Sequence, residues 1–154
     1  MGLDMYLNKK TYVKNWKHMS DDEKHTVSVE GKSSKEIKPE RITHIEEEIG
    51  YWRKANQIHN WFVNNVQGGV DDCKSHYVDV DNLEELSNLC KEVLADHSKA
   101  EELLPSSSGF FFGGTEYDGW YFQNLEYTVD MIDGILKEMK ENDTYYEFYY
   151  ESSW

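Results

Sequence analysis

The residues best suited to binding or chemistry are concentrated in one stretch, Leu103–Tyr121, which reads LLPSSSGFFFGGTEYDGWY. Its serine hydroxyls and free backbone N–H groups can donate hydrogen bonds, and its glycines let the backbone approach a ligand closely. Its phenylalanine rings offer flat faces for a nucleobase or another planar group. This combination favours a binding site for an anionic or sugar-like ligand with a flat part.

A structural interpretation of the same stretch is also open. Phe110–Phe112 is then a short buried strand or turn that fills the core, because large aromatic side chains gain roughly 1.5–3 kcal/mol each on burial. Gly109 and Gly113–Gly114 act as hinges at its ends. Successive side chains of an extended chain point to opposite faces, so at least one of the three rings is expected to face away from the core.

The binding interpretation gives each residue type a role. Ser106–Gly109 donate hydrogen bonds, while Trp52, Phe111 or Trp120 stacks on the ligand. Arg53, one of two arginines in the chain, balances the charge of an anionic group, although it is also placed for an ion pair with Glu46–Glu48. The predicted ligand-binding residues are Trp52, Arg53, Ser106, Ser107, Ser108, Gly109, Phe111, Glu116, Tyr117 and Trp120.

Catalytic and metal-binding patterns are weak by comparison. Asp72, Cys73 and His76, with His59, match neither paired CxxC nor HExxH spacing, so we expect no bound metal. GxSxG, phosphate-loop and dinucleotide-binding patterns are absent from the sequence, and we predict no catalytic residue and no cofactor. Glu116 and Asp118 have the types needed for a general acid and base, but Asp118 suits an N-cap better.

Charge limits the classes of partner. The chain has 154 residues and a formal net charge of −14, from 16 Lys and Arg against 30 Asp and Glu. Such a chain is repelled by nucleic-acid backbones and anionic membranes, so neither is expected as a direct partner. The N-terminal sequence lacks a leader-like apolar segment, no run approaches about 18 apolar residues, and the two cysteines make no disulfide framework, all of which favours the cytoplasm.

Aromatic residues make up 14% of the chain, with 11 Tyr and five Trp. Tyr and Trp combine a large apolar area with a polar group, which suits ligand pockets and protein interfaces as well as cores. The excess favours a recognition protein, and a homodimer is compatible with it.

Hydrophobic periodicity predicts one domain over residues 1–154. Helices are expected at 39–66, ended by Gly68–Gly69, then from Asp81 as N-cap to about His97, and from Trp120 or Tyr121 to Asn142–Asp143. Strands are expected at 2–8, 26–30 and 145–150, with a short one at 77–80. These elements give an α+β fold in which two or three long helices pack on a small antiparallel sheet that uses both chain ends.

Three segments together, MGLDMYL, YWRKANQIHNWFVNNVQ and LLPSSSGFFFGGTEYDGWY, resemble a family of small uncharacterised proteins encoded in bacteriophages and bacterial genomes. The resemblance covers Met1 to about Leu136. It implies a protein made in the cytoplasm of a bacterial cell, with phage infection as one setting, and it transfers no catalytic residue.

Three functions follow, in order of preference. The first is a non-catalytic phage counter-defence protein that sequesters a small anionic metabolite, such as a cyclic or ADP-ribose-type nucleotide, between the 105–121 loop and the 39–66 helix. The second is an acidic inhibitor that mimics nucleic acid and blocks a basic host protein. The third is an enzyme that processes such a nucleotide, with Glu116, Asp118 or His59 in the chemistry.

Overall fold

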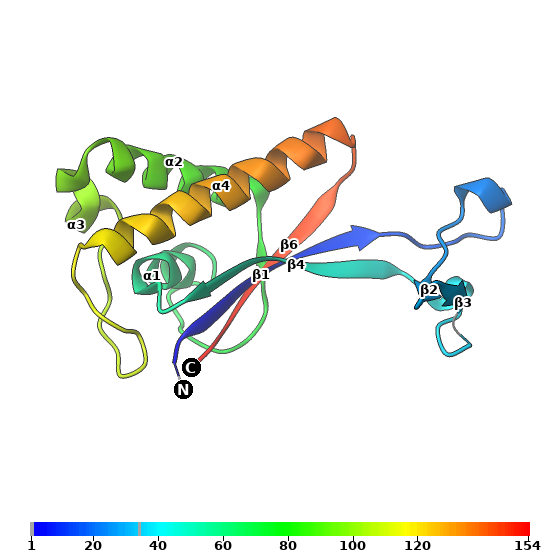
Figure 1. Cartoon of the computed structure of the whole chain (residues 1–154), viewed down its shortest axis with the longest axis horizontal. Helices are drawn as coiled ribbons and strands as arrows, with labels where there is room; N and C mark the ends of the chain where they lie inside the picture. Colours follow the sequence, from blue (N-terminus) through cyan, green and yellow to red (C-terminus); the bar gives the residue numbers. More distant parts are fainter. Residues whose placement is uncertain (1, 34) are drawn as a thin grey trace.

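Both ends of the chain lie side by side in one antiparallel sheet (Figure 1). The computed structural model describes residues 2–33 and 35–154. Strand β1 (Asp4–Tyr12) pairs with β6 (Tyr146–Ser153) from Asp4 opposite Ser153 to Thr11 opposite Tyr146. Strand β4 (His44–Arg53) pairs with the other side of β1, and β5 (His76–Val78) with the other side of β6, in the order β4-β1-β6-β5. The predicted α+β fold with a sheet built from both chain ends is confirmed.

Alternating side chains give the sheet two different faces. Along β1 from Asp4 to Lys10, and along β6, every second residue is buried, including Met5 and Leu7 on β1 and Phe148 and Tyr150 on β6. The residues between them are partly exposed. A half-buried antiparallel sheet shows this pattern when helices cover one face alone.

The helices cover the buried face (Figure 1). They are α1 (Asn56–Asn65), α2 (Val80–Ala95), the short α3 (Ala100–Leu103) and the long α4 (Gly119–Glu141). Asp118 caps α4 as predicted, because its Oδ1 accepts from the backbone N–H of Tyr121 at 3.1 Å. The N-cap of α2 is Asp79 instead of the predicted Asp81, whose own N–H donates to the Asp79 carboxylate.

The predicted helix over residues 39–66 was wrong. The segment contains a short 3-10 turn η2 (Pro39–Arg41), then strand β4, then helix α1. Gly50 on β4 lies against α4 so closely that a Cβ there would be 2.9 Å from Met131 Cε. Lys54 then takes a positive φ of 55°, which reverses the chain between the strand and α1. Spacing of three and four residues fitted a helix, but pairing with β1 decides the structure.

Residues 13–33 and 35–43 form an arm that projects from the body beyond the ends of β1 and β4 (Figure 1). It carries the 3-10 turn η1 (Asp21–Glu23) and a small hairpin of β2 (Ser28–Val29) and β3 (Lys32–Ser33). The strand expected at 26–30 is therefore present as β2 but is separate from the main sheet.

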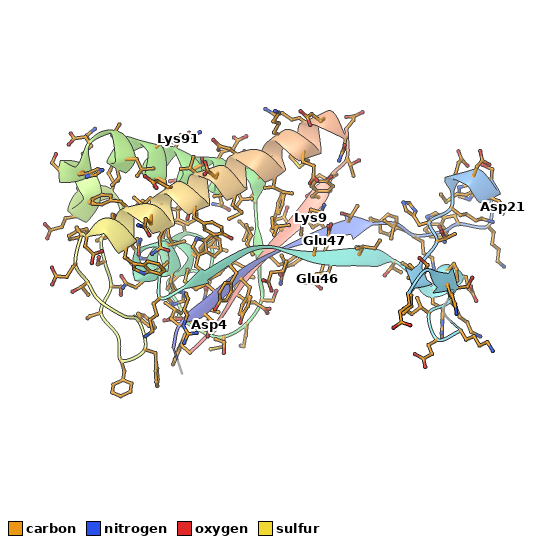
Figure 2. All side chains as sticks on the ribbon, viewed as in Figure 1. Asp4, Lys9, Asp21, Glu46, Glu47 and Lys91 are labelled. Atoms are coloured by element: carbon orange, nitrogen blue, oxygen red, sulfur yellow. The ribbon has the colours of Figure 1, made fainter. Side chains whose placement is uncertain are left out.

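A buried lysine holds the far end of α4 to the sheet. The Lys9 ammonium lies 2.8 Å from Glu47 on β4 (Figure 2). It also lies 3.6 Å from Glu138 on α4, and its side chain is 7% exposed. Burial alone would lower the pKa of Lys9, but the hydrogen bond and charge of Glu47, together with Glu138, raise it. The cation therefore stays charged and links β1, β4 and α4.

None of the described helices is long and apolar enough to cross a bilayer. Both cysteines are free thiols, and burial raises the pKa of Cys90 to about 12. A deeply buried neutral thiol of this kind behaves as a small apolar core side chain.

Removing residues 146–154 should abolish cooperative unfolding, because it deletes β6, an internal strand, together with the buried Phe148 and Tyr150. Chemical denaturation followed by tryptophan fluorescence measures this. The control is Trp154→Ala, which leaves the strand intact and should cost about 1 kcal/mol or less. A truncated chain that still unfolded in one steep transition would contradict the role given to β6.

Candidate functional site

The loop between α3 and α4 is held in place by one buried amide side chain. Asn56, 2% exposed, donates from Nδ2 to the carbonyl oxygens of Phe112 at 3.0 Å and Gly114 at 2.8 Å. Its Oδ1 accepts from the backbone N–H of Ser107 at 2.9 Å. The N-terminal residues add a further bond, from Leu3 N–H to the Phe111 carbonyl at 3.0 Å. The loop is thus fastened to the body at several points.

The fastened loop separates two hollows. The larger, of about 560 Å³, is called the His59 hollow, and it is lined by His59, Asn60, Val63, Asn64, Gly69, Asp71, Ser107, Ser108, Gly109, Phe110, Phe111, Phe112 and Trp154. The smaller, of about 230 Å³, is called the Glu116 hollow, and it is lined by Lys54, Asn56, Gln57, Ser106, Gly114, Glu116, Asp118, Trp120 and Tyr121. The larger is within the size range of small-molecule sites.

His59 is the buried polar group of the larger hollow. Its ring is 1% exposed, and Nδ1 lies 2.7 Å from the Tyr150 hydroxyl oxygen. Burial, and next the charge of Asp71, raise the pKa of Tyr150 well above its usual range, so the phenol remains protonated and able to donate to Nδ1. Nδ1 then accepts this hydrogen bond, so the ring hydrogen of the neutral imidazole is on Nε2.

The Nε2 atom of His59 retains hydrogen-bonding capacity. It lies 3.1 Å from Asp71 Oδ1, which is within ion-pair distance, but the geometry is too poorly aligned for a hydrogen bond. Among the residues that the structure describes, the atom has no hydrogen-bond partner. Asp71 also accepts from Trp154 Nε1 at 3.2 Å. A buried donor without an aligned acceptor is costly, and a ligand oxygen or ring nitrogen would satisfy it only by displacing the groups that cover it, among them the Asp71 carboxylate.

Aromatic rings wall the same space. The Phe112 ring lies 5.2 Å from the His59 ring at 82°, and 6.5 Å from the Trp154 ring. Phe111 and Phe112 are half-buried, while Phe110 is 96% exposed. The prediction that one ring of the triplet faces away from the core is confirmed, and the other two rings line the hollow with Trp154.

The loop residues of the predicted site divide between the two hollows. Ser107, Ser108, Gly109 and Phe111 line the His59 hollow. Ser106, Glu116 and Trp120 line the Glu116 hollow. The hydroxyl of Tyr117 accepts from the backbone N–H of Ser106 at 3.2 Å, so Tyr117 braces the loop.

The two β4 residues of the predicted site lie away from both hollows. Trp52 is 2% exposed and donates through Nε1 to Thr128 Oγ1 at 2.9 Å, which leaves no face of its ring for a ligand. Arg53 is exposed at the end of β4, opposite Asp4 and beside Gly2. These positions follow from the strand that replaces the predicted helix.

The electrostatics of the His59 hollow do not favour an anion. Its lining contains no Lys or Arg, and Asp71 places a carboxylate beside the buried imidazole. Arg53, which the sequence analysis expected to neutralise an anionic ligand, therefore does not do so in this hollow. An uncharged polar ligand meets no such penalty.

The arrangement also gives little support to nucleophilic catalysis. Both ring nitrogens of His59 face other groups, Tyr150 and Asp71, and within residues 2–33 and 35–154 no hydrogen bond joins His59 to a serine hydroxyl.

The described residues do not contain a group of three or more His, Cys, Asp or Glu side chains that could hold a metal ion. Asp72 and His76 instead pair with each other at 2.6 Å.

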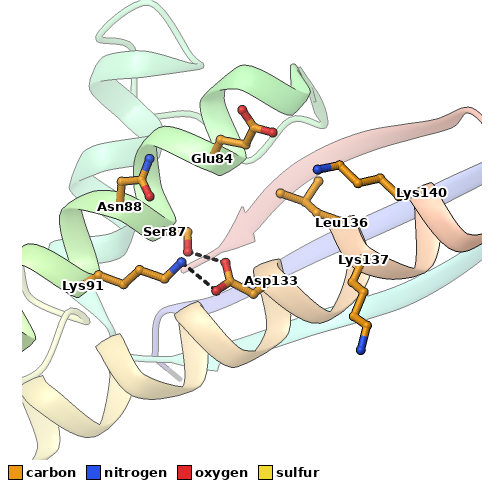
Figure 3. Close-up of a pocket in the computed structure, with 8 residues that line it drawn as sticks. All are labelled: Glu84, Ser87, Asn88, Lys91, Asp133, Leu136, Lys137 and Lys140. Atoms are coloured by element: carbon orange, nitrogen blue, oxygen red, sulfur yellow. Dashed lines mark hydrogen bonds and ion pairs between the residues drawn. The ribbon is translucent and has the colours of Figure 1, made fainter.

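A third hollow, of about 370 Å³, lies between α2 and α4 (Figure 3). Its polar groups satisfy one another, because the Asp133 carboxylate accepts from Ser87 Oγ at 2.6 Å and pairs with Lys91 Nζ at 2.7 Å. Burial alone would raise the pKa of Asp133, but these two partners lower it. We interpret this cluster as a polar contact that stabilises the packing of α2 against α4.

Sequence reasoning missed Asp71 and Trp154 and considered His59 for other roles. Asp71 lies in a polar linker, and Trp154 is the last residue. A histidine within the apolar run of α1 was the one available signal, since burial of His requires a polar partner.

No protein-family model, curated protein or solved structure matches the chain significantly.

Replacing Asn56 by Asp should detach the loop, because the carboxylate still accepts from Ser107 N–H but repels the carbonyl oxygens of Phe112 and Gly114. We expect a loss of roughly 2–4 kcal/mol in unfolding free energy and faster amide exchange at residues 105–114. Denaturant titration and hydrogen exchange measure these effects.

Asn60→Ala is the matched control on the same helix, since Asn60 is half-exposed and bonds through its side chain to Asn64 alone. It should change stability by about 0.5 kcal/mol or less. If both variants left amide exchange in the loop unchanged, Asn56 would not be the anchor.

Proposed function

We propose that this protein is a non-catalytic binding protein that captures a small planar ligand in the His59 hollow. The observation that carries the proposal is a hollow of about 560 Å³ that combines aromatic walls with a buried, incompletely bonded His59 Nε2. Small-molecule sites combine apolar walls with a few convergent polar groups in this way.

The chemistry of the lining favours a nucleobase or nucleoside. A heteroaromatic ring matches the walls formed by Phe111, Phe112 and Trp154. Its ring nitrogens and carbonyl oxygens can bond to His59, while the hydroxyls of Ser107 and Ser108 suit a sugar. A nucleotide would bind through its base, with its phosphates in solvent, because no cation lines the hollow. We therefore propose that the part of the ligand inside the hollow is uncharged, whereas the sequence analysis predicted an anionic ligand.

The biological role that we propose is sequestration of a nucleotide-derived signal inside a bacterial cell. The resemblance of the chain to small bacteriophage and bacterial proteins supports this setting and a cytoplasmic location, and within that setting we propose a part in phage counter-defence. Capture without turnover is consistent with a His59 whose basic nitrogen, Nδ1, is occupied by the Tyr150 hydroxyl, so that only the Nε2 hydrogen is left to donate.

Adenosine, guanosine, cytidine and uridine should be titrated calorimetrically into the full chain. At least one should bind with a Kd on the order of 10 µM, as expected for a ligand of this size. Ser108→Trp should abolish the heat by filling the His59 hollow, whereas Ser106→Trp, which fills the Glu116 hollow two residues away, should leave it unchanged. Flat titrations with all four nucleosides would contradict the proposal, and chromatographic detection of a product would indicate an enzyme.

Adding phosphates to the preferred nucleoside should weaken its binding. Repulsion between the Asp71 carboxylate and a phosphate at a partly exposed site costs about 1 kcal/mol. The 5′-monophosphate should therefore bind with a Kd about fivefold higher than that of the nucleoside. Asp71→Asn should reduce this difference in a parallel titration, while Asp72→Asn, on a neighbouring carboxylate outside the hollow, should not. A nucleotide that bound more tightly than its nucleoside would show that an anion site had been overlooked.

A further inference from the structure

The face of the sheet opposite the helices has an unusual composition. The strand register places four tyrosines there, Tyr6, Tyr51, Tyr77 and Tyr149. It also places five carboxylates there, those of Asp4, Glu46, Glu48, Glu147 and Glu151. We call these nine residues the open face. Aromatic residues of this kind are enriched at protein interfaces, where Glu and Asp are otherwise depleted.

The tyrosines are held in fixed positions. The rings of Tyr6 and Tyr51 lie 5.5 Å apart, and those of Tyr77 and Tyr149 lie 5.8 Å apart. The Tyr51 hydroxyl donates to Asp4, and the Tyr77 hydroxyl lies 3.0 Å from that of Tyr145. This last bond, with burial second, raises the pKa of Tyr77 to about 12. Because the tyrosine rings are already ordered, these side chains would lose little entropy when a partner contacts them.

The chain itself shows how this face holds a cation. The Lys10 ammonium lies 4.5 Å from the centre of the Tyr149 ring, and in the register Lys10 lies between Glu46 on β4 and Glu147 on β6. A cation over a tyrosine ring, with carboxylates on both sides, is electrostatically favourable. Four residues earlier on β1, on the same face, Tyr6 lies between Tyr51 and Glu151 without a lysine.

The negative charge on this face is largely uncompensated. Within the described part of the chain, Glu46, Glu48, Glu147 and Glu151 form no ion pair. The two cations in register with the face are Lys10 and Arg53. Figure 2 shows Asp4 and Glu46 at opposite ends of the paired strands β1 and β4, so the carboxylates extend over the length of the sheet.

A second copy of the chain is a poor occupant. A twofold contact would bring the same carboxylates of two copies together, and like charges in contact are destabilising. The outer edge of β4 also carries Glu46, Glu47 and Glu48, and charged side chains of this kind oppose edge-to-edge pairing. A polyanion is repelled for the same reason, which leaves a cationic partner.

We propose that the open face binds a basic protein surface rich in Arg and Lys, in the manner of a nucleic-acid mimic. The carboxylates stand in for phosphates and the tyrosine rings for bases. Arginine suits both, because its guanidinium bonds to carboxylates and stacks on aromatic faces. This inference is independent of ligand capture in the His59 hollow, which lies on the other side of the sheet among the helices.

The test uses a fluorescein-labelled deca-arginine peptide and the full chain, with binding followed by anisotropy at low and at near-physiological salt. The variant pair is Glu147→Gln with Glu151→Gln on the open face, against Glu101→Gln with Glu102→Gln on α3, which are exposed and carry the same charge change. We expect about tenfold weaker binding for the first pair and less than about twofold for the second. Equal losses would mean that net charge alone attracts the peptide, and would overturn the proposal.

Tyr6→Thr tests the aromatic part, because threonine keeps the strand preference and the charge but removes the ring. It should weaken peptide binding about threefold, with little change in salt dependence. Light scattering on the unmodified protein should give the mass of one chain at the same concentration. A doubled mass that the Glu147→Gln and Glu151→Gln pair removed would assign the face to a second copy and overturn the proposal. Nucleoside titrations of the same variants separate a failure here from a failure in the His59 hollow.

Discussion

The pairing of the two chain ends, β1 with β6, is the constraint on which the other parts of the molecule depend. It forms the centre of the sheet, since β4 adds to one side and β5 to the other. Tyr150 on β6 then links the sheet to the site, because its ring stacks on Phe62 of α1 at 3.9 Å and its hydroxyl bonds to His59. The position of the buried imidazole is thus set by a strand 91 residues away in sequence. Without that strand, α1 would lose both its packing partner and the polar partner of His59.

Asn56 performs the corresponding task for the loop. The turn at Lys54 places Asn56 at the start of α1, where its amide reaches Ser107, Phe112 and Gly114. A loop that is rich in serine and glycine pays a large entropy cost when it is ordered, and bonds to one buried side chain offset part of it. The hollow therefore results from the junction between β4 and α1 as much as from the loop sequence.

The sequence allowed prediction of those features that depend on local pattern. Alternation identified the N-terminal strand and aromatic composition the C-terminal one, and Asp118 could be recognised as an N-cap from its position before an apolar run. The helix over 39–66 was wrong because Ile42, Ile45 and Ile49 match helical spacing, while the partner that makes residues 44–53 a strand lies on β1. The same error misplaced Trp52 and Arg53, since adjacent residues on a strand point to opposite faces. His59, Asp71 and Trp154 meet through tertiary structure alone, and no local pattern could have grouped them.

The negative charge of the protein is distributed differently on the two faces of the sheet. The arm, residues 13–33 and 35–43, contains seven Lys and Arg against six Asp and Glu, so the net negative charge is carried by the rest of the chain. On the helix side, that charge reaches the His59 hollow as the single carboxylate of Asp71. On the other side it is spread over a sheet whose carboxylates have few partners. Because charges separated by more than about 8–10 Å are screened at physiological salt, a ligand in the hollow and a partner on the open face would respond to different groups. Salt should therefore weaken the second interaction far more than the first, which allows the two to be distinguished in one protein.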